Sequence, residues 1–276
     1  MTGPVILVEN LSKTFHIARP RHVVTALDSV SLAVEAGTCL AVVGESGSGK
    51  TTLARIIVGL ERADSGRVEI GGRPVAARAD RRELRSRASE IQMVFQDPQS
   101  SLNRRLRART AVEEVIAVHS DLDSRQRRER CAKLFEQVGL EVRHMDALPS
   151  ELSGGQLQRV AIARALAANP SVIVLDESVA ALDVTVQAQI LELLTDLRVA
   201  NGLTYLFITH DLSVVQMIAD QVVVMRRGQI VERGSMLDVL GRPQHPYTQL
   251  LLECAPRSGW KPRRGLIRAL REQGES

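Results

Sequence analysis

The sequence has few aromatic residues and few cysteines, and each shortage argues against a kind of function. Aromatic side chains make up 3% of the 276 residues, too few for the stacking surfaces on which proteins hold single-stranded nucleic acid. The cysteines Cys39, Cys131 and Cys254 show no CxxC or other metal-ligand spacing, which fits a reducing compartment. No apolar run approaches the roughly 18 residues that indicate a membrane-spanning helix. The N-terminus has no basic start before its short apolar patch, so we expect no signal peptide.

The remaining composition is typical of a folded α/β protein. A hydrophobic content of 44% and a charged content of 25% are ordinary for a globular domain, and the length suits one large domain, or one domain and a tail. The net charge of +4 comes largely from arginine. An anionic partner, nucleic acid or a lipid surface, would explain two arginine clusters, but a solvated face explains them better because Asp80 and Glu83 interrupt the first. The clusters are Arg78, Arg81, Arg82, Arg85 and Arg87, and then Arg104, Arg105, Arg107 and Arg109.

The stretch Cys39–Leu60 carries the strongest functional signal. Leu40–Val43 has the character of a buried strand, and the residues from Thr52 onward have the apolar spacing of a helix. Between them, Gly44–Thr51 fits the phosphate-loop pattern G-x-x-x-x-G-K-[ST] at every position. In such a loop the glycines let backbone N–H groups face a phosphate, the lysine reaches the β- and γ-phosphates, and the threonine hydroxyl can ligate Mg²⁺. A chance Gly/Ser turn is the alternative, but the flanks favour a nucleoside triphosphate site.

Strands alternate with helices along the chain, which predicts a mainly parallel sheet with ligands at the carboxyl ends of its strands. From Gln99 to about Pro149 the pattern is helical and poor in strand residues, so we expect a helical insertion. After Gly241 the chain is rich in proline and arginine, and we expect a surface tail there. The predicted strands are Ile6–Glu9, a strand pair in Val23–Val34, Arg67–Ile70, Ile91–Phe95, Ser171–Leu175, Leu203–Ile208, and a hairpin of Gln221–Met225 with Gln229–Glu232. The predicted helices outside the insertion are Asp80–Ser89, Ser153–Ala168 and Val184–Ala200.

Polar side chains follow several of the predicted strands. Asp176 ends a buried strand, where its carboxylate suits Mg²⁺ held at a triphosphate, and Glu177 beside it could orient and polarise an attacking water. An Asp–Glu pair alone is a weak signal, because it could simply cap the next helix. Gln96 and His210 also follow strands, so both could converge on the γ-phosphate, although a structural role is the usual alternative for one histidine.

Leu152–Gln156 contains two glycines in the first turn of a predicted helix. Each costs about 1 kcal/mol relative to alanine at such a position, so ordinary structure does not explain them. A bare helix N-terminus that offers N–H groups and the Ser153 hydroxyl to an anion would explain them. The sequence therefore predicts a second phosphate-binding element.

Taken together, these motifs resemble the ATP-binding subunits of ABC transporters over roughly Val5 to Leu252. The resemblance implies an ABC-type P-loop NTPase fold with a mainly parallel core sheet, an N-terminal antiparallel β subdomain and a helical insertion. It identifies Gly44–Thr51 as Walker A, Val172–Glu177 as Walker B, Gln96 as the Q-loop, Leu152–Gln156 as the signature and His210 as the switch histidine. It implies Glu177, His210 and Lys50 as catalytic residues and Thr51, Gln96 and Asp176 as Mg²⁺ ligands. The ATP contacts that it implies are Phe15, Gly44, Glu45, Ser46, Gly47, Ser48, Gly49, Lys50, Thr51, Thr52, Gln96, Ser153, Gly154, Gly155, Gln156 and Asp183.

The resemblance also implies partners and a location. In this family a head-to-tail dimer encloses ATP between Walker A of one subunit and the signature helix of the other, and Glu177 acts as the general base. Ile91–Pro98, Ser100–Asn103 and His245–Thr248 resemble the ATPases of dipeptide, oligopeptide and nickel importers, and Thr51–Ile70 resembles the second of their two ATPases. We therefore expect a sister ATPase, or a second copy, with integral membrane permease subunits and an extracytoplasmic binding protein. The chain would lie peripherally at the cytoplasmic face of the cell membrane.

We expect an ATPase domain over 1–252, with its helical subdomain at about 99–168, and a basic tail over 253–276. Two residues depart from the family pattern: Ala180 replaces a serine near the expected dimer interface, and Arg104 replaces a proline after Asn103. Two alternatives remain: an ABC-type ATPase that acts on nucleic acid or ribosomes, and a regulatory cassette with little turnover. The first is disfavoured because there is no second Walker A motif and only about a hundred residues separate Lys50 from Ser153.

Overall fold

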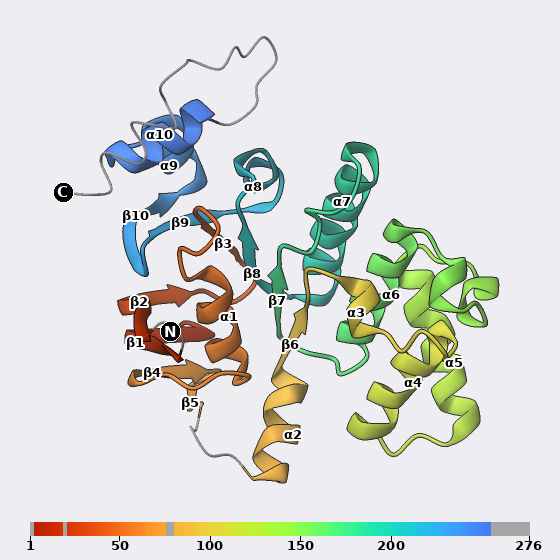
Figure 1. Cartoon of the computed structure of the whole chain (residues 1–276). Coiled ribbons are helices and arrows are strands. Elements are labelled where there is room, and N and C mark those ends of the chain that lie inside the picture. The colour runs from red at the N-terminus through yellow and green to blue at the C-terminus, as the bar shows by residue number, and fades with distance from the viewer. Residues whose placement is uncertain (1–2, 19–20, 76–79, 255–276) are drawn as a thin grey trace.

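Two β-sheets and the helices around them make up the structure, a computed structural model that describes residues 3–18, 21–75 and 80–254 (Figure 1). One sheet has four strands in the order β2-β1-β4-β5, and the other has six in the order β10-β9-β3-β8-β7-β6. In the part of the chain that is described, no helix combines the length and apolar character that crossing a bilayer requires. The fold is the mixed α/β architecture with a separate antiparallel sheet that the sequence resemblance implies.

The four-stranded sheet is antiparallel and starts at the N-terminus. Its long hairpin pairs Ile6 with Val34 and continues, through register shifts, to the pairing of Ala18 with Arg21. The sequence analysis divided this region into shorter strands, and that division was wrong. Asn10 and Ser29 take positive φ angles of 49° and 52°, so the register shifts interrupt the apolar alternation without ending the strands. The strands are β1 (Ile6–Ala18), β2 (Arg21–Val34), β4 (Ser65–Ile70) and β5 (Arg73–Pro74).

The six-stranded sheet is parallel except for the β9–β10 hairpin. Its central strands are buried on both faces, as expected of strands covered by helices on both sides. Alternation along β3 sends Leu40 and Val42 into the core beneath the antiparallel sheet, whereas Cys39, Ala41 and Val43 enter the core on the other side. The strands are β3 (Cys39–Val43), β6 (Ile91–Val94), β7 (Val172–Asp176), β8 (Thr204–Thr209), β9 (Gln221–Arg226) and β10 (Gln229–Ser235).

Helices fill both cores. The helix after the phosphate loop packs Leu53, Ile56 and Ile57 between the two sheets, while the helices that follow β7 cover the opposite face of the six-stranded sheet. The side chain of Asp80 caps the N-terminus of α2, the charged helix that the sequence predicts. Gly202 ends α7 in the left-handed conformation. These helices are α1 (Lys50–Val58), α2 (Arg81–Glu90), α7 (Val184–Asn201), α8 (Leu212–Ile218), α9 (Met236–Gly241) and α10 (Pro246–Cys254).

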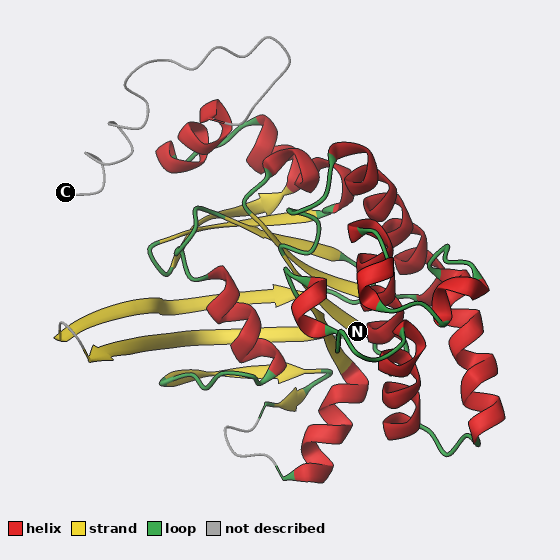
Figure 2. Ribbon diagram, turned by 45° about the vertical axis from the view of Figure 1, so that its right-hand side comes forward, coloured by secondary structure: helices red, strands yellow, loops and turns green. Residues whose placement is uncertain are grey.

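Between β6 and β7, a stretch described without a gap, the chain forms helices only, as the sequence analysis expected. Figure 2 shows these helices on the side of the molecule opposite the β1–β2 hairpin. Val112, Phe135 and Ile162 are fully or almost fully buried in their common core. The elements are α3 (Pro98–Ser101), α4 (Ala108–His119), α5 (Ser124–Gln137), the 3₁₀ turns η1 (Val142–Met145) and η2 (Pro149–Glu151), and α6 (Gly154–Leu166).

The expectation of a surface tail after Gly241 was wrong for residues up to Leu252, which is buried in the main core. Helix α10 begins at Pro246, and its residue Tyr247 is only 1% exposed and belongs to the main core. Proline suits the first turn of a helix, where its missing N–H has no partner to lose. The rest of the predicted tail, residues 255–276, lies outside the described residues.

Candidate functional site

The phosphate loop joins β3 to α1 in a conformation that favours glycine at three positions. Gly44, Gly47 and Gly49 have φ angles of 153°, 83° and 105°, where an L-residue is strained. A Cβ on Gly44 would lie 2.2 Å from the carbonyl oxygen of Met225, and one on Gly49 would lie 2.2 Å from that of Ala26. The loop therefore needs glycine for close approach to neighbouring backbone as well as for its φ angles.

Lys50, the first residue of α1, lies inside this loop. Its side chain is buried, and its ammonium donates hydrogen bonds to the carbonyl oxygens of Gly44 (2.8 Å) and Glu45 (2.7 Å). Burial lowers the pKa of Lys50, while the negative charges of Glu177 and Asp176 act in the opposite direction. The loop thus holds a buried ammonium with its own carbonyl groups.

The rest of the loop fits an oxyanion ligand. Glu45, Ser46 and Gly47 are exposed, and Thr52 is half-buried in the first turn of α1. The Ser48 hydroxyl is buried and has no hydrogen-bond partner among the described residues. Because buried hydroxyl groups are normally paired, phosphate oxygens would supply an acceptor that this donor lacks.

Asp176 and Thr51 form a pair suited to a hard cation. The Thr51 hydroxyl lies 3.2 Å from Asp176 Oδ1 at the end of β7. Burial raises the pKa of Asp176, although its hydrogen bond with Thr51 opposes that shift. Within the described residues, no group of three or more His, Cys, Asp or Glu side chains gathers to hold a metal. Mg²⁺ is usually held by one or two protein oxygens together with substrate phosphates, so the Thr51–Asp176 pair could contribute to such a site.

Glu177 lies between Gln96 and His210, two residues for which the sequence analysis expected convergence on the γ-phosphate. Gln96 Nε2 donates a 2.9 Å hydrogen bond to Glu177 Oε2, and His210 Nδ1 lies 3.4 Å from Oε1. Strand order explains the meeting: β6, β7 and β8 are neighbours in the sheet, and the three residues follow their carboxyl ends. Glu177 itself has a φ of 46°, a conformation that costs a non-glycine residue about 1–3 kcal/mol. Its N–H donates to the Ile208 carbonyl (2.9 Å), which holds the residue in place.

The signature segment makes its contacts away from the phosphate loop of its own chain. Ser153 and Gln156 form a reciprocal cap at the start of α6, and Gln156 also reaches the ring of His144 at 3.2 Å. A Cβ on Gly155 would come within 2.5 Å of Val186 Cγ1, and one on Gly154 would meet Leu182 at 3.4 Å. Close packing on α7 therefore explains Gly155, a structural reason that the sequence analysis did not identify.

Two other predicted contacts lie on separate elements. Asp183 caps α7 by accepting the Val186 N–H at 3.0 Å, and Ala180 is exposed just before it. Phe15 is half-buried on β1 of the antiparallel sheet, where its ring stacks 5.0 Å from the Lys13 ammonium. Asp183 and Phe15 both lie outside the Glu177 cluster.

The arginine clusters behave as a solvated and paired surface. Arg81, Arg82 and Arg85 are exposed on α2. Arg107 and Arg109 both bind Asp146, at 2.9 and 2.7 Å. Arg78 lies outside the described residues.

One contact of the loop was missed from sequence. The Tyr247 hydroxyl of α10 accepts the Glu45 N–H at 3.2 Å. The motif His245–Thr248 served in the sequence analysis only as a mark of subfamily, and no pattern linked it to a loop some 200 residues earlier. The feature of the sequence that could have indicated this contact is an aromatic residue one position after a proline that can begin a helix.

Comparison with known proteins gives consistent matches. A family model described as "ABC transporter" matches residues 27–180. The chain is 42% identical over 269 residues to the dipeptide transport ATP-binding protein DppF of Escherichia coli K12, covering 96% of this chain and 80% of that protein. It is also 42% identical over 253 residues to the oligopeptide transport ATP-binding protein OppF of Streptococcus mutans, covering 91% and 82%. A solved dimeric post-hydrolysis state of the ATP-binding cassette MJ0796, bound to ADP and Pi, matches with a TM-score of 0.76 and 31% identity, covering 84% of this chain and 98% of that one.

Proposed function

The chain belongs to the ABC transporter family, whose members couple ATP hydrolysis to transport, and we propose that its own complex imports dipeptides or oligopeptides. The support is that relatives at 42% identity over most of the chain are described as dipeptide and oligopeptide transport proteins. Nickel, the other cargo that the sequence resemblance allows, has no such support from these two relatives. The alternatives of a nucleic-acid ATPase or a low-turnover cassette are not favoured.

The Glu177 cluster is the observation that carries the catalytic proposal. In it, Glu177 takes the proton from the attacking water, and His210 contacts the γ-phosphate. Both oxygens of Glu177 already have a neighbour, Gln96 on one side and His210 on the other. Each carboxylate oxygen can accept a second hydrogen bond, so Glu177 can hold the attacking water while Gln96 and His210 fix its orientation.

Lys50, Thr51 and Asp176 hold the phosphates and Mg²⁺ in this proposal. The ammonium of Lys50 has three N–H donors, so it would keep the Gly44 carbonyl as an acceptor and exchange the Glu45 carbonyl for oxygens of the β- and γ-phosphates. Thr51 and Asp176 offer oxygens that would hold Mg²⁺, and the amide oxygen of Gln96 is the third proposed ligand. When bound, Mg²⁺ would neutralise the charge that develops on the phosphate oxygens.

A second cassette completes the site. Ser153, Gly154, Gly155 and Gln156 sit at a helix N-terminus suited to an anion, and their own contacts are with α7 and His144 rather than with the loop. We assign them to the ATP held by the partner subunit, with Asp183 at the interface. The dimeric cassette among the similar structures is consistent with that arrangement. A sister ATPase is the proposed partner, and a second copy of this chain the alternative.

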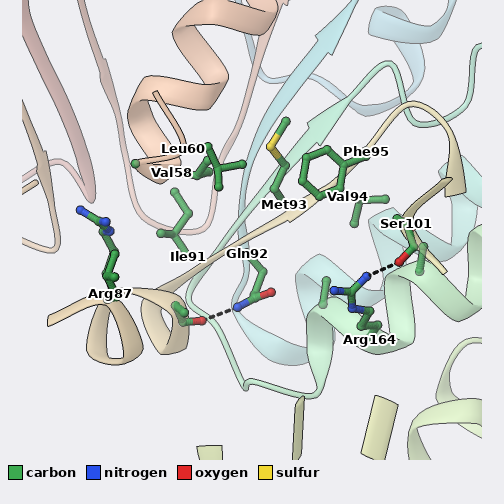
Figure 3. A pocket seen from close by; sticks show the side chains of 15 residues that line it. Val58, Leu60, Arg87, Ile91, Gln92, Met93, Val94, Phe95, Ser101 and Arg164 are labelled. Atoms are coloured by element: carbon green, nitrogen blue, oxygen red, sulfur yellow. Dashed lines mark hydrogen bonds between the residues drawn. The ribbon is translucent and has the colours of Figure 1, made fainter. Parts of the chain in front are cut away.

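An apolar groove next to the active site is the proposed docking site of the membrane subunits (Figure 3). It has a volume of about 340 Å³ and lies between the end of α1, α2, β6 and α6. Its side chains Leu60, Leu84 and Phe95 are 61%, 44% and 36% exposed, an arrangement that favours an apolar partner segment. Arg87 and Arg164 lie on opposite sides of it, so the segment would carry acidic residues. Phe95 directly precedes Gln96, so a segment docked on Phe95 would lie next to a member of the Glu177 cluster.

These partners imply a place in the cell. The chain would sit at the cytoplasmic face of the membrane, bound to permease subunits that receive cargo from an extracytoplasmic binding protein. The test is to purify this chain with the membrane subunits encoded beside it and to measure ATP hydrolysis in vesicles. Hydrolysis stimulated by a peptide-loaded binding protein supports the proposal. No copurification, or stimulation by nickel and not by peptides, contradicts it.

A further inference from the structure

The phosphate loop is held from outside by residues that the catalytic proposal does not use. Tyr247 of α10 accepts the Glu45 N–H at 3.2 Å, and Gly228 in the β9–β10 turn donates its N–H to the Ser48 carbonyl at 3.0 Å. Arg226, at the end of β9, stacks its guanidinium 4.8 Å from the Tyr247 ring. Both ends of the loop therefore contact the C-terminal part of the chain.

The Tyr247 contact falls on one particular peptide group. The N–H of Glu45 and the carbonyl of Gly44 belong to the same planar peptide. Its N–H side is bound by Tyr247, and its carbonyl side accepts the ammonium of Lys50 at 2.8 Å. Tyrosine and lysine thus hold opposite edges of a single peptide plane.

This plane would otherwise turn easily. Gly44 precedes it with a φ of 153°, and glycine offers little steric resistance to rotation of the peptide that follows. Glu45 and the next two residues are exposed, so packing does little to fix them. The Ser48 N–H donates to the Glu45 carbonyl at 3.2 Å, and Lys50 donates to the Gly44 carbonyl at 2.8 Å. Tyr247 therefore adds the hydrogen bond on the N–H edge of this peptide.

Tyr247 is itself rigidly placed. Its side chain is almost completely buried, and burial raises the pKa of its hydroxyl, which stays protonated at neutral pH. The N-terminus of α10 is anchored by Glu232, whose carboxylate accepts the N–H groups of Gln244 (2.8 Å) and His245 (3.1 Å). The Tyr247 N–H in turn donates to His245 Nδ1 at 3.1 Å. The motif His245–Thr248 therefore builds a fixed support for one hydroxyl.

We propose that Tyr247 is a positioning residue for nucleotide binding: it orients the Gly44–Glu45 peptide so that Lys50 is held ready for the phosphates. This inference rests on the proposed role of the loop, and it adds the C-terminal helix α10 to the nucleotide site. It assigns Tyr247 no contact with ATP or with the reacting atoms.

The test compares the two tyrosines of the chain. Tyr247→Phe removes the hydroxyl at the loop. Tyr205→Phe removes an equally buried hydroxyl that donates to the Leu194 carbonyl on α7 at 2.9 Å, away from the loop. Loss of one neutral hydrogen bond predicts that Tyr247→Phe raises the Kd and KM for ATP about threefold to tenfold, with kcat changed less than about twofold because the Glu177 cluster is untouched. Tyr205→Phe should leave both constants within about twofold of wild type.

A double-variant experiment tests the connection with Lys50. Lys50→Ala alone should weaken ATP binding at least about tenfold, since it removes a charge-assisted contact. In that background Tyr247→Phe should add less than about twofold, because its effect acts through the lysine. Full additivity would show that Tyr247 does not work through Lys50 and would overturn the proposal.

Other outcomes also decide the matter. Wild-type Kd and KM in Tyr247→Phe, a fall in kcat alone, or an equal rise of KM in Tyr205→Phe would each overturn the inference. If Tyr247→Phe does not fold, amide hydrogen exchange in the nucleotide-free wild-type chain replaces it: the Glu45 amide should exchange more slowly than that of exposed Gly47, and equal rates would refute the bond. Failure of the wild-type chain to bind ATP would instead refute the proposed function of the loop.

Discussion

Replacing Glu177 with glutamine is the most direct test of the catalytic assignment. The substitution keeps the size of the side chain and leaves an amide oxygen to accept from Gln96 Nε2, now 2.9 Å from the carboxylate. The backbone bond from Glu177 N–H to the Ile208 carbonyl is unaffected. The change therefore removes basicity with little change of geometry.

The size of the effect follows from the role. A positioned general base contributes about 10²–10⁴-fold to a rate, which corresponds to about 3–5 kcal/mol of activation free energy. Glu177→Gln should therefore lower kcat for ATP hydrolysis by at least about a hundredfold. The Kd for ATP should stay within about threefold, because Lys50, Thr51 and Asp176 are intact.

The assay is single-turnover hydrolysis with enzyme in excess, combined with equilibrium ATP binding and the size of the ATP-bound species. The variant should accumulate as an ATP-bound dimer, because ATP stays between the two subunits. Glu192→Gln, which neutralises an exposed carboxylate on α7, is the matched control and should hydrolyse ATP normally. A Glu177→Gln rate within about tenfold of wild type would refute the general-base assignment.

The remaining predictions concern the interface, the buried acid and the groove. Ser153→Arg should prevent ATP-induced dimerisation in gel filtration while the monomer still binds ATP, because the signature acts on the partner's nucleotide. Asp176→Asn should raise the melting temperature of the nucleotide-free chain at pH 7.5. Burial raises the pKa of Asp176 in the folded state. The protonated carboxyl therefore contributes stability below the unfolded-state pKa, and this stability is lost as the pH rises through the folded-state pKa. Each 1 kcal/mol regained is about 2–4 °C in a chain of this size. Phe95→Asp should weaken copurification with the membrane subunits without changing ATP binding by the isolated chain.

Each of these predictions has an outcome that contradicts it. Loss of nucleotide binding in monomeric Ser153→Arg would mean that the signature acts within its own chain. An Asp176→Asn melting temperature that does not exceed wild type at pH 7.5, or a difference that does not shrink toward the ordinary pKa of aspartate, would contradict the effect of burial. Normal copurification of Phe95→Asp would place the membrane subunits elsewhere.

The phosphate loop and its partners could be predicted from the sequence because their chemistry is local. Gly44–Thr51 needs its residue types at fixed spacing, and Gln96, Glu177 and His210 each follow a recognisable buried strand. Parallel strands present their carboxyl ends at one edge of a sheet, so the meeting of these side chains follows once the strands are recognised.

Features that depend on distant backbone could not be predicted. The carbonyl of Met225 lies where a Cβ of Gly44 would be, and Val186 lies where a Cβ of Gly155 would be; neither neighbour is evident from the sequence near the glycine. The prolines before Tyr247 suggested an irregular tail, but Pro246 begins a helix whose aromatic residue is buried. Likewise, the long β1–β2 hairpin was divided because its register shifts break the alternation on which strand prediction depends.

The left-handed backbone of Glu177 has a consequence for the evolution of stability. Because Glu177 has a φ of 46°, glycine at this position would make the folded state more stable by about 1 kcal/mol or more. Next to it, Asp176 is a carboxyl group that burial disfavours in its ionised form. A selection that rewarded heat resistance without requiring transport would therefore replace these two neighbours early, and heat-resistant variants from such a selection would be enriched in inactive ATPases.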